Sequence, residues 1–432
     1  MSSIHHADEL TRRQFMSNAA RAYLGVHLFP MLGGTLASSA PANVASAAKA
    51  KHVIYLFMSG GMSHVDTFDP KPKKKDVMGL TETINTKVDG FQLGHYLKNT
   101  AEVADKMCVI NSMNSTQGAH EQGAYIMHTS YPMRGTIKHP SLGSWVVKLG
   151  GRIHPELPAF VAVNSAPDHA GGGFFGAKYA AALIGSPDEG LQDSHRADGV
   201  SQEDFDRRLT LADKLNREFH GRYPNADVQA YEELYREAIS LMNSKDLKAF
   251  DLSQETETTR KLYGSGRFAQ GCLLARRLVE NGVRFIEVQL GGWDTHYDNF
   301  AGVAGRCLEF DQAYAALITD LEKLGKLHDT LVVVATEFGR TPELNVDHKN
   351  GRDHHPSAFS CVLAGGGIKG GVKHGLTDAS GDKVKDGIVS VQDFNATIAH
   401  ALGLPFDTVL MSPSKRPFKI ADKGVPITAL FG

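Results

Sequence analysis

Short hydrophobic runs alternate with segments of helical periodicity along most of the chain. Strands are predicted at 52–58, 107–113, 159–163, 283–290, 332–334 and 360–364. Helices are predicted at 141–149, 265–281, 304–327 and 391–402. The run Val332–Val334 is β-branched and uncharged, which is typical of a strand covered on both faces in a parallel sheet. The pattern therefore predicts an α/β fold.

Between about residues 202 and 261 the sequence becomes strongly charged while keeping a helical period. Such a segment is typical of amphipathic helices whose charged faces meet solvent. We interpret it as a helical insertion, or a lid, within one domain that covers residues 48–432.

The first 47 residues have the pattern of an export signal. Arg12 and Arg13 form a twin-arginine pair, an apolar stretch follows at 22–37, and Ala45-Ser46-Ala47 offers a cleavage site. We predict export by the Tat translocon, cleavage after Ala47, and a periplasmic or extracellular location. The alternative is an amphipathic helix or a membrane anchor, but the apolar stretch is too short and Gly-rich to span a bilayer well. No other stretch predicts a stable membrane span.

Composition narrows the class of protein. The chain has 432 residues, of which 42% are hydrophobic and 22% charged, as in ordinary globular proteins. The formal net charge of −2 points to neither a nucleic-acid partner nor an anionic membrane. The 20 histidines agree with metal or acid–base chemistry. The four cysteines are far apart and favour buried thiols, although a disulfide after export is the alternative.

Polar side chains with the chemistry of a site follow the strand at 332–334. Glu337 and Arg340 come just past its end, and Asp353 and His354 follow in a loop closed by Pro356. Sites in open α/β sheets form at the carboxyl ends of strands. We therefore predict Glu337, Asp353 and His354 as metal ligands. Arg340 would clamp an anion, with a salt bridge to Glu337 as the alternative.

Two other strand ends bring similar residues. Asp294 and His296 follow the strand at 283–290 and point to one face in extended chain, so they could give one metal two ligands. Asp66 follows the strand at 52–58 and a Gly-Gly pair. The simpler alternatives are a turn for Asp66 and Asp294, and a backbone hydrogen bond for His296.

The loop after the strand at 107–113 carries hydroxyl groups before a predicted helix. Ser115 or Thr116 could be a nucleophile, with His120 nearby, because a helix N-terminus stabilises an anion. Alternatively, either hydroxyl could cap the helix, and the residue types favour this capping role.

Four ordered pieces carry a family resemblance: GGMSHVDTFDPKP, LLARRLVENGVRFIEVQLGGWDTH, TEFGRTPELN and GRDHHP. Together with the twin-arginine signal, they resemble the DUF1501 family, which is related in fold to the alkaline phosphatase and sulfatase superfamily. The resemblance implies a three-layer α/β/α sandwich with a mostly parallel sheet. It also implies one or two divalent metals at the carboxyl strand ends and cleavage of phosphate or sulfate esters. The sequence has no C-x-P-x-R or C-x-S-x-R motif, so a formylglycine sulfatase is not implied.

Three hypotheses follow. The first is an exported hydrolase of phosphate or sulfate esters, in which metal-activated water or a hydroxyl attacks a small anionic ester or a sulfated or phosphorylated glycan. Mixed nitrogen and oxygen ligands favour Zn²⁺ or Mn²⁺ over Ca²⁺ or Mg²⁺. The second is a non-catalytic exported protein that keeps the fold and binds an anionic glycan or a partner protein. The third is a hydrogen-bonded network of Asp and His without a metal.

Overall fold

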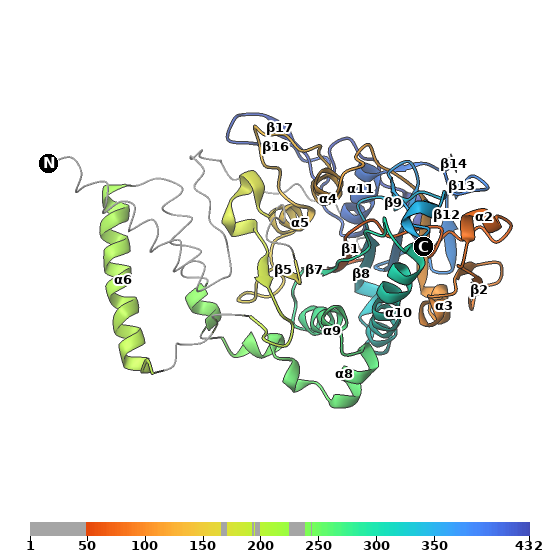
Figure 1. Ribbon diagram of the computed structural model, residues 1–432. Helices are drawn as coiled ribbons and strands as arrows, with labels where there is room; N and C mark the ends of the chain where they lie inside the picture. Colours follow the sequence, from red (N-terminus) through yellow and green to blue (C-terminus); the bar gives the residue numbers. More distant parts are fainter. Residues whose placement is uncertain (1–48, 166–170, 192–193, 195–198, 224–237, 243) are drawn as a thin grey trace.

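One nine-stranded sheet organises the molecule (Figure 1). The computed structural model describes residues 49–432 except 166–170, 192–193, 195–198, 224–237 and 243, so the predicted signal at 1–47 lies outside the described residues. The strand order is β12 (Val372–His374), β4 (Met107–Asn114), β11 (Phe359–Gly365), β8 (Thr330–Ala335), β1 (His52–Met58), β7 (Phe285–Leu290), β5 (Phe160–Val163) and β6 (Ala182–Ile184). The short β15 (Val389–Ser390) also pairs with β4.

The sheet is parallel except at β11, which runs antiparallel to both β4 and β8. Parallel neighbours need a crossover, which is usually a helix. The link from β8 to β11 contains only the short pair β9 (Gly339–Arg340) and β10 (His354–His355) and the 3-10 turn Val346–His348. Without a crossover helix the chain returns in the opposite direction, and this link holds much of the candidate site.

Two helical layers cover the sheet, which confirms the predicted three-layer sandwich (Figure 1). In β1, Ile54, Leu56 and Met58 face one core and the alternate residues face the other. The first core is covered by α3 (Lys98–Glu102), α9 (Arg267–Glu280) and α10 (Asn299–Lys323). The second is covered by α4 (His120–Thr129), α5 (Leu142–Gly150) and α11 (Val391–Ala401).

The local pattern predicted most elements well. The strand at 52–58 is confirmed residue for residue. The helix α10 starts at Asn299, before the predicted residue 304. Gly302 and Gly305 weaken the helical signal of its first turns because glycine is a poor helix former. All four cysteines are buried free thiols, as expected.

The region read as a helical insertion contains α6 (Gln202–Arg222), two 3-10 segments at Lys245–Phe250 and Leu252–Gln254, and α8 (Glu257–Tyr263). Figure 1 shows α6 standing apart from the sheet. A role as a lid stays a prediction. Within the part of the chain that the structure describes, no helix is both long and apolar enough to cross a membrane.

Candidate metal centre

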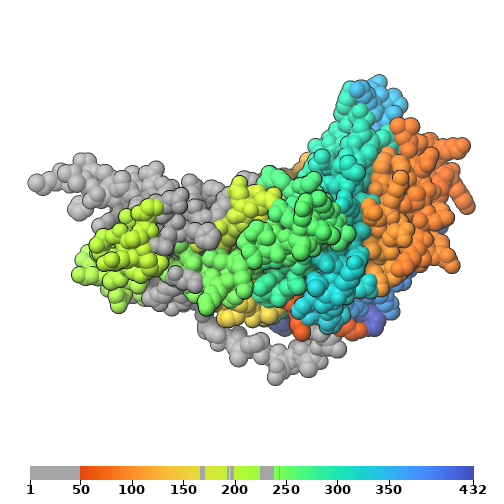
Figure 2. Space-filling view, turned by 90° about the horizontal axis from the view of Figure 1, so that it is seen from below, coloured from red at the N-terminus to blue at the C-terminus, as the bar shows by residue number. Residues whose placement is uncertain are grey.

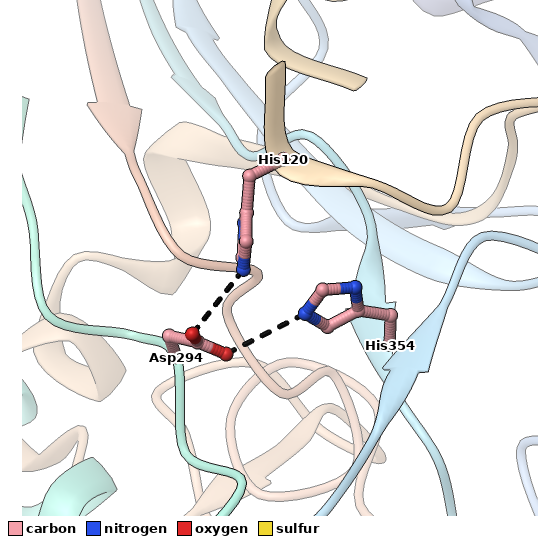
Figure 3. A group of neighbouring side chains, drawn as sticks. All are labelled: His120, Asp294 and His354. Carbon is pink, nitrogen blue, oxygen red and sulfur yellow. Dashed lines mark ion pairs between the residues drawn. The ribbon is translucent and has the colours of Figure 1, made fainter. Parts of the chain in front are cut away.

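His120, Asp294 and His354 come together from three separate parts of the fold (Figure 3). His120 is the first residue of α4, Asp294 follows the end of β7, and His354 lies in β10. One ligand atom from each of the three lies within 4.8 Å of the others. Figure 3 shows both imidazole rings directed at the Asp294 carboxylate, with His120 above it and His354 to its right. The geometry therefore groups residues that lie between 60 and 234 positions apart in the chain (354 − 294 and 354 − 120).

The Asp294 carboxylate is the hub of this cluster. Its Oδ2 lies 3.3 Å from His120 Nε2. Its Oδ1 lies 3.5 Å from His354 Nε2 and 3.2 Å from His296 Nε2. His296 and His354 also bring their Nε2 atoms to within 2.9 Å of each other. We call His120, Asp294, His296 and His354 the metal cluster.

Each imidazole is fixed on its outer side by an acceptor. The Nδ1 of His120 is 2.8 Å from Glu337 Oε1, and the Nδ1 of His296 is 2.7 Å from Asp353 Oδ1. The Nδ1 of His354 is 2.7 Å from the carbonyl oxygen of Gly118. A carbonyl or ionised carboxylate can only accept, so each Nδ1 must carry the hydrogen. In the neutral rings, the Nε2 lone pairs then point inward.

A cation between these inward lone pairs would satisfy them, as would a proton on one of the rings. His296 Nε2 and His354 Nε2 cannot hydrogen-bond each other when both lack a proton. His120 Nε2 is buried and has no hydrogen-bond partner among the described residues. Three imidazole nitrogens and one carboxylate match the donors that bind Zn²⁺ and similar ions, and outer acceptors of this kind typically orient such ligands. The residues present therefore fit a divalent metal.

The pKa shifts of Asp294 and His354 agree with this arrangement, whereas the pKa shift of His120 favours its protonated form. Burial would raise the pKa of the Asp294 carboxyl, but Arg340, His120 and His296 hold that pKa below its usual value. The Glu337 hydrogen bond raises the pKa of His120. Burial lowers the pKa of His354, which favours its neutral form. Asp294 is thus ionised near neutral pH and His354 is uncharged, as metal ligands must be.

Arg340 is directed at the cluster's carboxylate and not at solvent. Its guanidinium is fully buried, and Nη2 donates to Asp294 Oδ1 at 2.5 Å. It also donates to the carbonyl oxygens of Gly60, Gly61 and Arg352. The predicted anion clamp would need this group exposed. The structure instead makes Arg340 a brace that holds Asp294 against the turn after β1.

Glu337 and Asp353 stand behind the cluster. Glu337 is buried, accepts the backbone N–H of Gly60 at 2.8 Å, and orients His120. Asp353 has a side chain that is 59% exposed, and it orients His296. Both were predicted as direct metal ligands. In the structure, an imidazole ring lies between each of these carboxylates and Asp294.

Asp66 lies in a separate buried ion pair. Arg352 Nε donates to its Oδ2 at 2.9 Å, and both side chains are fully buried. Ser63, Thr81 and Asn299 also donate to this carboxylate. Five hydrogen bonds already satisfy its two oxygens, so the structure does not bring Asp66 to the metal cluster.

Thr116 lies on an exposed turn after β4. Its hydroxyl accepts from Gln117 Nε2 at 3.1 Å, while Ser115 Oγ accepts from the backbone N–H of Gln117 at 3.2 Å. Neither hydroxyl caps α4, whose N-cap residue is Ala119. The loop still contributes to the site, because Gly118 holds His354.

Sequence reasoning did not single out Arg352 or the buried pair His128 and Glu287. His128 Nε2 lies 3.1 Å from Glu287 Oε1 and joins α4 to β7, the two elements that carry His120 and lead to Asp294. A glutamate inside the mostly apolar run 285–290 is the signal that could have found it, since a buried charge requires a partner.

Comparison with known proteins gives a family and several solved structures to which the chain is similar. A family model described as a protein of unknown function (DUF1501) matches residues 50–431, which confirms the family predicted from the motifs. Among curated proteins, no sequence matches at a significant level.

Among solved structures, the chain is similar to the lipoteichoic acid synthase LtaP from Listeria monocytogenes, with 11% identity, a TM-score of 0.38, and 84% of this chain and 74% of that chain covered. It is also similar to the PsFucS1 sulfatase from Pseudoalteromonas sp., with 13% identity, a TM-score of 0.37, and 88% and 73% covered. Alkaline phosphatase from the Antarctic bacterium TAB5 shows 15% identity, a TM-score of 0.34, and 75% and 95% covered.

Proposed function

The chain belongs to the DUF1501 family, and we propose that it is a metal-dependent hydrolase of phosphate or sulfate esters. The observation that carries the proposal is the set of inward lone pairs. Three imidazoles, each held at Nδ1 by an outer acceptor, turn Nε2 toward Asp294. Such an arrangement is costly for the folded protein unless a cation is bound.

In this proposal His120, Asp294, His296 and His354 hold the metal. A mixed nitrogen and oxygen set favours Zn²⁺ or Mn²⁺. A bound metal would lower the pKa of a water molecule and offset the negative charge that develops on an ester oxyanion. Glu337 keeps His120 in the ligating tautomer, and Arg340 keeps Asp294 ionised and in place. Asp353 likewise keeps His296 in the ligating tautomer.

The cluster is open to a substrate. The side chains of Asp294 and His296 are 46% and 41% exposed, so an ester group can approach them from solvent. Water is the simplest nucleophile in such an open site. Thr116 remains the candidate side-chain nucleophile, because its exposed turn leads directly into Gly118 and the cluster. The Tat signal predicted at 1–47 would place this activity outside the cytoplasm.

Metal content is the first test. We would measure metals by mass spectrometry in the purified protein and in a His120→Ala/His354→Ala variant. The matched control is His328→Ala/His374→Ala, which removes two histidines outside the cluster. We expect stoichiometric metal in the wild type and in the control, and its loss in the cluster variant. A wild type that binds no Zn²⁺ or Mn²⁺ would refute the proposal and leave the hydrogen-bonded network.

Turnover separates the hydrolase from a second candidate, a metal-containing binding protein without catalysis. The second candidate is favoured by the Thr116 hydroxyl, which bonds Gln117 and not a cluster residue. We expect the metal-loaded wild type to hydrolyse 4-nitrophenyl phosphate or 4-nitrophenyl sulfate, and the cluster variant to be inactive. Bound metal without turnover of either ester would favour the binding protein.

A further inference from the structure

A basic face forms where three chain segments meet around Phe418. The segments are 131–150, 171–180 and 405–423. The Phe418 ring lies 5.2 Å from Tyr131 and 5.1 Å from Phe174. The Tyr131 hydroxyl donates to the carbonyl oxygen of Lys419. The backbone N–H of Phe174 donates to the carbonyl oxygen of Lys138. Figure 1 shows α5 and the hairpin of β16 (Leu410–Met411) and β17 (Pro417–Phe418) on the same side of the sheet.

The charge of this face differs from that of the chain. The three segments contain eight Lys or Arg residues and two Asp residues, whereas the whole chain has a net charge of −2. Arg134, Lys415 and Arg416 are exposed, and no ion pair joins them to a carboxylate of the described chain. Asp407 does not neutralise these three residues, since its carboxylate forms an ion pair with Lys419 at 3.2 Å. The three segments therefore carry a net charge of +6 (eight cations minus two carboxylates) on a nearly neutral protein.

The basic face adjoins the metal cluster through α4. This helix begins at His120, and residues 131–141 continue from its end and fold back on it. The hydroxyl of Tyr125, on α4, lies 2.8 Å from His139 Nδ1. Tyr125 lies five positions after His120 on this helix, which corresponds to about 8 Å along the helix axis. A polymer bound on the face could therefore reach the cluster with a neighbouring unit.

We propose that the basic face binds a polyanionic polysaccharide and presents its ester groups to the metal cluster. The presentation step rests on the proposed function, whereas the binding step does not. Clustered cations attract a chain of repeated sulfate or phosphate groups far more than a single small ester. The proposal thus narrows the substrate class from any anionic ester to an ester carried on an anionic glycan.

The aromatic residues of the face distinguish this partner from a single-stranded nucleic acid. Proteins that bind single strands offer free ring faces on which bases stack. Here Tyr131 is buried and stacks on His139 with ring centroids 4.6 Å apart. Phe418 meets Tyr131 edge to face, with the ring planes 81° apart. The rings therefore hold the three segments together, and we expect the face to recognise its ligand through charge.

The test uses the full chain and three probes: heparin as a sulfated polysaccharide, dextran as an uncharged one, and a single-stranded DNA oligonucleotide. The variant is Arg134→Gln/Lys415→Gln/Arg416→Gln. The matched control is Lys73→Gln/Lys74→Gln/Lys385→Gln, which removes the same charge from exposed positions outside the three segments. All six positions are exposed, so both triple variants should fold like the wild type.

We expect the wild type to bind heparin more weakly as salt rises and not to bind dextran. The face variant should bind heparin about tenfold more weakly, as three exposed charge contacts imply, and the control should stay within about twofold. Equal heparin affinity of the two triple variants would overturn the proposal. DNA binding as tight as heparin binding, and lost in the face variant, would overturn the choice of a polysaccharide.

Two readouts separate this proposal from the proposed function. The His120→Ala/His354→Ala variant should still bind heparin like the wild type, because the face contains neither residue. The face variant should hydrolyse a small chromogenic ester normally and show a raised KM for an esterified polymer. Heparin binding without any turnover would refute the hydrolase and support the binding face. Turnover of small esters without heparin binding would support the hydrolase and refute the binding face.

Discussion

Replacing Asp66 with asparagine distinguishes a structural carboxylate from a metal ligand. The sequence places Asp66 after a strand end, where ligands are expected, yet the structure surrounds it with Arg352 and three other donors. We expect Asp66→Asn to lower stability strongly and to leave the metal content unchanged. A metal ligand would behave in the opposite way, with metal lost and stability affected mainly through that loss.

The magnitude follows from the hydrogen bonds of the carboxylate. Ser63, Asn299 and Arg352 donate to Oδ2, and Thr81 and Arg352 donate to Oδ1. An amide has one acceptor oxygen, so the donors facing the new NH₂ group lose their partner. The Arg352 guanidinium also becomes a buried charge without a counterion. Breaking a buried ion pair from one side costs about 3–5 kcal/mol.

This loss converts to a measurable change in melting temperature. With an unfolding entropy of about 2 cal/mol/K per residue over roughly 380 residues, 4 kcal/mol lowers Tm by about 5 °C. Differential scanning fluorimetry would measure the shift and mass spectrometry the metal. Asp89→Asn, at an exposed carboxylate, is the control and should change stability by less than about 0.5 kcal/mol. An unchanged Tm together with loss of metal would refute the ion-pair interpretation and return Asp66 to the ligand set.

Three further predictions test the surroundings of the cluster. Glu337→Gln should weaken metal binding about 10- to 100-fold in a competition with a chelator, because His120 loses the ionised acceptor that fixes its tautomer, and Glu343→Gln should have no such effect. Removing metal with a chelator should lower Tm, and free Zn²⁺ at about 100 times its Kd should restore about 2.7 kcal/mol of stability; a His296→Ala/His354→Ala variant that responded equally to Zn²⁺ would contradict the ligand assignment. Acid should also destabilise the protein through His139, because burial, reinforced by the charge of Arg134, lowers the pKa of that ring to about 4. The unfolded chain binds the proton more readily, so this contribution is complete above the unfolded pKa of 6.5 and is lost as the pH falls toward about 4. His139→Phe, which keeps an aromatic ring against Tyr131, should flatten the stability profile over this range in denaturant titrations, and an unchanged slope would contradict the assignment.

The sequence alone determined the elements and the kinds of chemistry. Hydrophobic runs and helical periods are local signals, so β1 could be predicted residue for residue and α9 within two residues at its start and one at its end. The presence of carboxylates and imidazoles after strand ends also predicted where a site would form, because parallel strands present their carboxyl ends at one edge. Asp294, His296 and His354, which the structure brings close together, were all singled out in this way.

Only the tertiary structure decided which of these residues face one another. Asp66 and Asp294 both follow buried strands, but one meets Arg352, 286 positions away, and the other meets three imidazoles. Glu337 and Asp353 became outer acceptors because His120 and His296 stand between them and Asp294. A strand end fixes the position of a residue, whereas the direction of its side chain depends on loops from distant parts of the chain. That is why the residue types of the candidate site could be predicted from the sequence and their division into inner and outer sets could not.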